Sequence, residues 1–154
     1  MSLALSACKA LSLGLTQLIS LKSLNLGLRW GKCISDTSVK YVMESVSCLI
    51  GLESLNLDLY GSGSLTDKSM YFLSEACLSL RNLTHFAFFC WRCQDITNEG
   101  IKKLKDGLRM LEKLSAIELH FGWCESIDDE SLRFLKKGIQ YKIIVFFNPK
   151  FNLL

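Results

Sequence analysis

The segment Leu49–Ser79, LIGLESLNLDLYGSGSLTDKSMYFLSEACLS, contains two different hydrophobic periods in succession. In its first half, Leu55, Leu57 and Leu59 alternate with polar residues, which is typical of a short strand with one buried face. From Met70 onward, apolar residues recur at intervals of three or four, which is typical of one stripe of an amphipathic helix. The segment therefore predicts a strand, a loop and a helix, in that order.

The same pattern recurs along the chain, at positions whose residue numbers differ by 31. Nine columns keep this spacing through four units without an insertion. Examples are Leu18, Leu49, Leu80 and Leu111; Leu24, Leu55, Phe86 and Ile117; and Ile34, Leu65, Ile96 and Ile127. A fixed period of this kind indicates a solenoid, in which each repeat packs against the next. We expect the second of these columns to form one buried ladder across adjacent strands.

An aspartate or asparagine stands three residues before each helical stripe. These residues are Asp36, Asp67, Asn98 and Asp129. Their side chains can accept a hydrogen bond from the first turn of a helix, so we expect them to be the N-caps. Ser35, Thr66 and Thr97, each one residue earlier, are the alternative caps.

The repeat frame organises the chain as one domain, residues 1–154. Its predicted units are a partial leading repeat at 1–18, repeats near 18–48, 49–79, 80–110 and 111–141, and a shortened terminal strand within 142–154. Residues 4–18 are interpreted as the helix of the leading repeat rather than as a secretory signal, and Ile143–Phe147 as the last strand. Neither end resembles the polar cap that a solenoid requires. We expect at least one end to be covered by a partner, by a second copy or by further chain.

Several segments resemble the consensus of the leucine-rich repeats. Leu49–Leu57 has the form L-x-x-L-x-x-L-x-L, and short elements after the strands resemble the I-T-D-x-G-L element of the cysteine-containing and ribonuclease-inhibitor-like subtypes. These elements are Ile34–Asp36, Leu65–Asp67, Ile96–Ile101 and Ile127–Asp129. Cys77 matches the cysteine position of the first subtype. The period departs from the family, since it is longer than the usual span of about 20–29 residues.

The resemblance implies an α/β solenoid, a horseshoe arc of about four to five strand–helix repeats with a parallel sheet on the concave side. Simple geometry also favours an arc, because strands stack about 4.8 Å apart whereas a helix needs about 10 Å. Proteins of this family mostly serve as recognition scaffolds. The resemblance therefore implies a protein partner.

Residues between the buried columns of each strand should point away from the core. Exposed aromatic side chains beside charged groups suit a protein-binding surface. We expect a recognition face made of Asn25, Arg29, Asn56, Asp58, Tyr60, His85, Phe89, Trp91, Glu118 and His120. The alternative is that a long loop or an adjoining chain covers these side chains.

The chain has seven cysteines, and Cys90-Trp-Arg-Cys93 is a CxxC motif. Cys93 and Cys124 share a column, so they should be neighbours on adjacent repeats. A zinc site needs four convergent ligands, whereas Cys90 lies in an inward strand column, away from the histidines. We expect reduced, packed thiols and no metal or cofactor, with a redox role as the remaining alternative. An odd number of cysteines favours an intracellular, cytoplasmic protein.

Composition narrows the function classes. A net charge of +3 is a weak argument for nucleic acid. The longest uncharged window near the N-terminus, Ala10–Leu21, has 12 residues, and a membrane helix needs about 20. We expect the basic residues of two predicted helices to lie on a solvated outer face. They are Lys102, Lys103, Lys105, Arg109, Lys113, Arg133, Lys136 and Lys137.

The sequence contains no G-x-S-x-G motif, Gly-rich phosphate loop or H-E-x-x-H motif, so we expect no catalysis. The expected function is a protein–protein interaction module that presents a concave sheet. Two alternatives stay open: a structural subunit of a large assembly, and the substrate-recognition part of a ubiquitin-ligase adaptor, whose repeats the I-T-D-like element also resembles.

Overall fold

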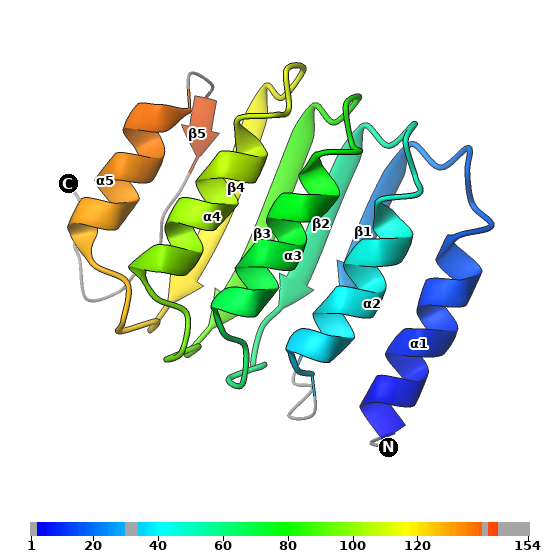
Figure 1. The fold of residues 1–154 in the computed structure, drawn as a ribbon, viewed down its shortest axis with the longest axis horizontal. Coiled ribbons are helices and arrows are strands. Elements are labelled where there is room, and N and C mark those ends of the chain that lie inside the picture. The colour runs from blue at the N-terminus through cyan, green and yellow to red at the C-terminus, as the bar shows by residue number, and fades with distance from the viewer. Residues whose placement is uncertain (1–2, 30–33, 140–141, 145–154) are drawn as a thin grey trace.

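The computed structural model describes residues 3–29, 34–139 and 142–144. Within these ranges, helices and strands alternate along the chain (Figure 1). The helices are α1 (Leu3–Leu15), α2 (Asp36–Val46), α3 (Asp67–Cys77), α4 (Asn98–Leu108) and α5 (Asp129–Gly138). The strands are β1 (Ser23–Gly27), β2 (Ser54–Leu59), β3 (His85–Trp91), β4 (Ala116–Gly122) and β5 (Lys142–Ile144). All of these strands form one sheet in the order β1-β2-β3-β4-β5, and every pair is parallel.

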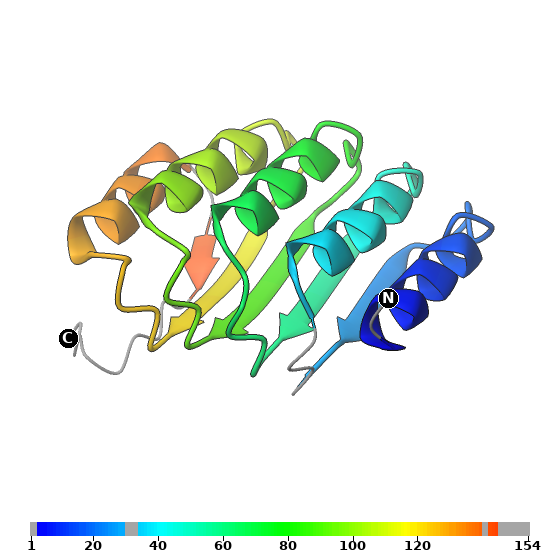
Figure 2. The same ribbon diagram turned by 60° about the horizontal axis from the view of Figure 1, so that its bottom comes forward.

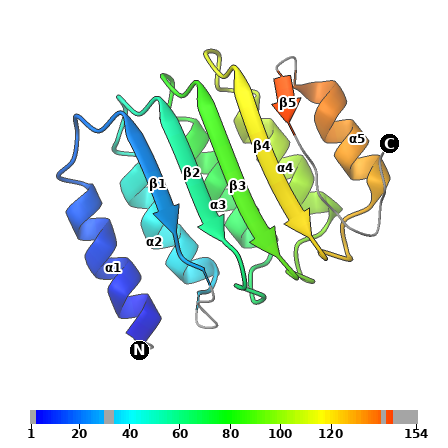
Figure 3. The ribbon, with the colours of Figure 1, turned by 180° about the vertical axis from the view of Figure 1, so that it is seen from behind.

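The helices form one layer against a single face of the sheet (Figures 1 and 2). Seen from behind, β1–β4 lie in front of the helix layer, and none of the described helices crosses in front of them (Figure 3). This arrangement follows from the repeat, because each helix returns the chain over the same face before the next parallel strand begins. The described residues thus form an α/β array of strand–helix repeats.

The strand register confirms the predicted ladder. Leu24 pairs with Leu55, Leu55 with Phe86, and Phe86 with Ile117. The side chains of Leu55, Phe86 and Ile117 are at most 2% exposed and belong to the core between the sheet and the helices. Leu24 is only partly buried, since β1 is the edge strand of the described sheet.

The two ends of the array differ from its centre. Leu18 is 48% exposed, although the other members of its column are buried. It lies in the turn between α1 and the edge strand β1, and no described strand precedes α1. At the other end, β5 pairs Ile143 with Ile117, so the residue number rises by 26 from one strand to the next rather than by 31. The rest of the predicted strand, up to Phe147, and the residues that follow lie outside the described ranges.

The helix caps fall one residue before the aspartates and the asparagine, so the alternative caps Ser35, Thr66 and Thr97 are confirmed. The N-caps of α2, α3, α4 and α5 are Ser35, Thr66, Thr97 and Asp128, each in an extended conformation. For example, Thr97 Oγ1 accepts a hydrogen bond from the backbone N–H of Glu99 at 3.2 Å. The predicted caps Asp36, Asp67, Asn98 and Asp129 are instead the first helical residues. A cap must be extended to turn its side chain over the helix end, and the earlier residue meets that condition.

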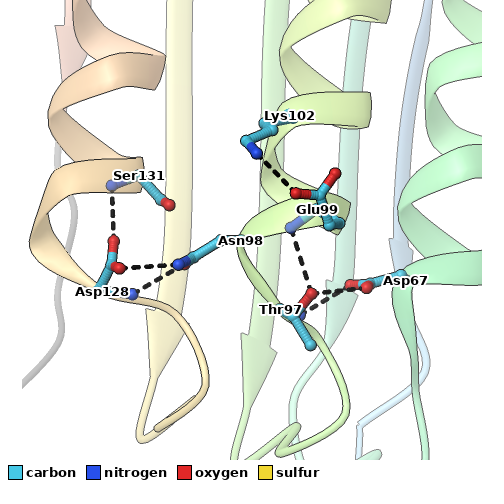
Figure 4. Close-up of polar contacts among 7 residues, drawn as sticks. All are labelled: Asp67, Thr97, Asn98, Glu99, Lys102, Asp128 and Ser131. Atoms are coloured by element: carbon cyan, nitrogen blue, oxygen red, sulfur yellow. Dashed lines mark hydrogen bonds and ion pairs between the residues drawn. The ribbon is translucent and has the colours of Figure 1, made fainter.

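The first helical residues Asp36, Asp67 and Asn98 link one repeat to the next (Figure 4). Asp67 accepts two hydrogen bonds from Thr97, one from the backbone N–H and one from the hydroxyl, both at 2.7 Å. Two further pairs repeat this link: Asp36 with Thr66, and Asn98 with Asp128. The caps Thr66, Thr97 and Asp128 are therefore positioned by the helix that precedes each of them.

The helices α3 and α4 approach each other closely at Gly107. A Cβ atom at this position would lie 2.5 Å from Ser74 Cα and 2.6 Å from Ser74 Oγ. Real Cβ atoms do not come this close to backbone, so the contact needs glycine. Gly107 thereby fixes the spacing between these two repeats.

Candidate functional site

Alternate residues of β1–β4 point to the face of the sheet opposite the helices, which we call the open face. Along β3, exposed or half-buried residues alternate with fully buried ones, and β4 follows the same pattern until its last residue. The ten predicted recognition residues occupy these alternate positions, with Arg29 two residues after the end of β1 and Tyr60 directly after β2. The binding role of these residues stays a prediction.

Three aromatic side chains form a row across the carboxyl ends of β2, β3 and β4. This aromatic row consists of Tyr60, Trp91 and Trp123. The ring centroids of Tyr60 and Trp91 lie 5.1 Å apart, and those of Trp91 and Trp123 lie 6.4 Å apart. Tyr60 and Trp91 are half-buried, whereas Trp123 is 39% exposed. Large rings with a polar tip are the side chains that dominate the energetics of protein interfaces.

A second aromatic contact lies on β3 and β4. Phe89 stacks on the imidazole of His120, with ring centroids 4.5 Å apart and planes inclined by 19°. Glu118 Oε1 lies 2.9 Å from His120 Nε2, so the carboxylate holds the imidazole in this orientation. The stacked rings of Phe89 and His120 present a flat surface, and the Glu118 carboxylate adds a negative charge at its edge.

The charged pair at the aromatic row differs from the prediction in one respect. Asp58 is buried rather than exposed, because Arg29 from the edge of the sheet covers it and donates from Nε to its Oδ2. The backbone N–H of Tyr60 donates to Asp58 Oδ1 at 3.0 Å. Asp58 therefore anchors Arg29 and the start of the loop after β2, while the largely exposed guanidinium faces solvent.

The amino-terminal half of the open face is more polar. Asn25 and His85 are exposed, and His85 Nδ1 lies 2.8 Å from Thr84 Oγ1. Asn56 Oδ1 is buried and lacks a hydrogen-bond partner among the described residues. A shallow pocket of about 240 Å³ adjoins it, lined by side chains that include Asn56, His85, Ala87 and Glu118. The unpaired amide oxygen offers an acceptor to a donor that enters this pocket.

Sequence reasoning did not single out two contributors to the aromatic row. A Cβ atom at Gly122 would meet the Trp91 ring at 2.1 Å, so this glycine lets the indole lie against the backbone of β4. Trp123 has a left-handed backbone with φ of 58°. Its repeat column also contains Gly61 and Arg92, with φ of 84° and 57°. The glycine of this column was the one available signal for the turn.

Three cysteine sulfurs converge in the core at the ends of β3 and β4. Cys90 Sγ lies 3.8 Å from Cys124 Sγ, and the sulfurs of Cys90, Cys93 and Cys124 all lie within 4.8 Å of one another. The predicted proximity of Cys93 and Cys124 is confirmed. The inward direction predicted for Cys90 is also confirmed, and its side chain joins the same group, which the sequence pattern did not predict.

The three thiols titrate together. Hydrogen bonds from Cys90 and Cys93 lower the pKa of Cys124. Burial, followed by the contact with Cys124, raises the pKa of Cys90, and the hydrogen bond to Cys124 raises the pKa of Cys93 to about 12.

The predicted basic face needs one correction. Lys105 is not solvated: it is 6% exposed, and its Nζ lies 3.1 Å from the centroid of the Phe134 ring, so it makes a cation–π contact between α4 and α5. Lys102 and Lys113 are exposed and hydrogen-bond to Glu99 and Asn82. These contacts give Lys102, Lys105 and Lys113 structural roles.

Comparison with known proteins gives a fold and no family. No protein-family model matches the sequence, and no curated protein matches it. Among solved structures, the chain is similar to one described as leiomodin-1 actin-binding site 2 (ABS2). The TM-score is 0.64 at 14% sequence identity, over 99% of this chain and 82% of the other. None of the described helices has the length and apolar character needed to cross a membrane. The chain shares the fold of that structure, and its parallel sheet with alternating strands and helices is consistent with leucine-rich-repeat-like repeats.

Proposed function

We propose that this chain is a non-catalytic protein-interaction module of the leucine-rich-repeat type, close to the cysteine-containing and ribonuclease-inhibitor-like subtypes. In this proposal residues 1–154 form a single cytoplasmic horseshoe domain, with the open face on its concave side. The observation that carries the proposal is the aromatic row Tyr60, Trp91 and Trp123 on a face that no described helix covers.

The surroundings of the aromatic row suit recognition of another protein. Its rings contact one another, and Asp58 fixes the loop in which Tyr60 lies, so little side-chain freedom is lost on binding. Arg29 adds an exposed cation at one end, and the His120 and Glu118 pair adds polar groups beside Phe89. A centre of aromatic anchors with a charged rim is the usual composition of a protein interface.

The fold gives independent support. Leiomodin-1 uses a domain of this fold in an actin-binding site, so the architecture is one on which a protein surface can be recognised. For the present chain the partner is proposed only as a protein that offers apolar or aromatic side chains flanked by acidic groups, which would face Arg29.

The test is a comparison of matched variants. Affinity capture from an extract of the source cells should recover the same protein with the wild type and with Tyr71→Ala. Tyr71 is 46% exposed on α3, in the helix layer. Tyr60→Ala and Trp123→Ala should lose that protein, because each removes a ring of the aromatic row. Circular dichroism must show that all variants remain folded.

The outcome also separates the alternatives. Partners that exchange with added free chain support a recognition module, whereas one stoichiometric complex that survives purification supports a structural subunit. Capture that is lost in Tyr71→Ala but kept in both variants of the aromatic row would refute the open face as the binding surface.

A further inference from the structure

The three converging cysteines come from two adjacent repeats. Cys90 belongs to β3, Cys93 follows that strand, and Cys124 follows β4. Their side chains are 2%, 0% and 0% exposed, and their sulfurs lie within 4.8 Å of one another. Sulfurs at this separation need only a small movement to bind one ion between them.

The backbone turns two of these thiols inward by an unusual route. Arg92 and Trp123, the residues just before Cys93 and Cys124, both have a left-handed conformation, with φ of 57° and 58°. Residues other than glycine rarely adopt it, since the Cβ atom approaches the following carbonyl oxygen. Arg92 is held there by a hydrogen bond from its N–H to the carbonyl of Gly122 at 2.8 Å. The same turn recurs at Gly61, which precedes the buried Ser62, so this turn of the repeat directs the next side chain into the core, and in two repeats that side chain is a cysteine.

The third thiol occupies a position that other repeats fill with larger side chains. Cys90 pairs in register with Leu59 of β2 and with Phe121 of β4, both fully buried. A plain hydrophobic core would favour a residue of that size here, because interiors are closely packed. The chain has a cysteine instead, at the one repeat where Cys93 and Cys124 can reach it.

The donor set selects the chemistry of the ion. It consists of sulfur alone, and the histidines and carboxylates of the described residues do not join the group. Zinc in a closed protein site requires four tetrahedral ligands. Soft thiolate ligands without nitrogen or oxygen suit Cu(I).

We propose that Cys90, Cys93 and Cys124 form a buried three-sulfur site for a soft monovalent cation, Cu(I). Each thiol that coordinates the ion releases its proton to solvent, and the oxidation states of copper and sulfur do not change. The site is separate from the open face, so this proposal does not depend on the proposed function.

Variants that resemble other repeats keep the test independent of folding. Cys90→Leu restores the residue found at Leu59, and Cys93→Ser restores the residue found at Ser62, the buried member of its own column. Cys77→Ala is the matched control, because Cys77 is buried in α3 and lies outside the group. All proteins carry serine in place of Cys33 and Cys48, so that these thiols do not contribute.

The reduced proteins are titrated without oxygen against Cu(I) held by a coloured chelator. The parent protein carries only the serine substitutions at Cys33 and Cys48. The parent and Cys77→Ala should each remove one equivalent of Cu(I) from the chelator. X-ray absorption of the resulting complex should show only sulfur neighbours around copper. Cys90→Leu and Cys93→Ser should remain folded by circular dichroism and weaken binding by more than about 100-fold, since loss of an outer-shell partner alone costs 10–100-fold. Equal uptake by the parent and Cys90→Leu would overturn the proposal. So would displacement of Cu(I) by equimolar Zn(II), or nitrogen and oxygen neighbours in the absorption spectrum.

Discussion

Asp67 and Thr97 lie 30 residues apart in the sequence and are joined by two hydrogen bonds of 2.7 Å. Thr97 in turn accepts a hydrogen bond from the N–H of Glu99, which caps α4. The first residue of α3 therefore fixes the side chain that begins α4. Because similar pairings join Asp36 with Thr66 and Asn98 with Asp128, the starts of α2, α3, α4 and α5 are coupled to one another.

The substitution Asp67→Ala should lower the free energy of unfolding by about 1.5–3 kcal/mol, the usual contribution of hydrogen bonds to a charged group. Asp106→Ala, at an exposed position of α4, is the control and should change it by less than about 0.5 kcal/mol. Urea unfolding of both variants measures the difference. Equal losses would show that the pairing between repeats carries no stability.

The two faces of β2 should respond differently to truncation. Leu55→Ala opens a cavity in the core, where Leu55 is 2% exposed, and should cost about 2–5 kcal/mol. Ser54→Ala, the preceding residue on the open face, should stay within about 0.5 kcal/mol. Denaturant titration of the two variants tests the assignment of faces, which similar losses at both positions would contradict.

Strand register was predictable from the sequence because it depends on spacing alone. Leu55 and Phe86 are one repeat period apart and lie opposite each other, as parallel strands with equal connections require. The choice between two cap positions stayed open because neighbouring residues such as Thr97 and Asn98 both carry side chains that can cap a helix. Backbone conformation decides between them, and composition contains no signal for it.

The candidate site was predictable only where it follows strand alternation. Trp91 lies on the open face as its position in the strand requires, whereas Trp123 joins it through a left-handed turn at a residue that rarely adopts one. Asp58 is buried by the long side chain of Arg29, a contact that no period describes. The convergence of Cys90 with Cys124 depends on the same kind of turn, so sequence columns could not show it.

Two helical glycines should respond to alanine with opposite signs. Gly107→Ala should destabilise the protein, because its Cβ would lie 2.5 Å from Ser74 Cα and force α3 away from α4. Gly14→Ala in α1 should stabilise it by up to about 1 kcal/mol, because nothing lies within 4 Å of the place that its Cβ would occupy and alanine favours the helix. Thermal unfolding of the two variants gives the signs, and a stabilised Gly107→Ala would disprove the close approach of these helices.

The cap of α5 should make stability depend on acid. The backbone N–H of Ser131 and then the amide of Asn98 donate to Asp128, which holds the pKa of this carboxyl below its ordinary value of 3.8. The unfolded chain therefore binds a proton more readily than the folded one. The stability from the ionised cap is fully present above the unfolded pKa and is lost as the pH falls through the folded pKa.

Asp128→Thr isolates this contribution, since threonine occupies the same column at Thr66 and Thr97 and still caps a helix. At about pH 6 the variant and the wild type should unfold at similar urea concentrations, because both caps are intact. Between about pH 5 and about pH 2 the wild type should lose more stability than the variant, because only the wild type must protonate a hydrogen-bonded carboxylate at this position. The other acidic groups titrate in both proteins and cancel in the difference. If both proteins lost the same amount of stability as the pH fell, the contribution of Asp128 to α5 would not depend on its charge.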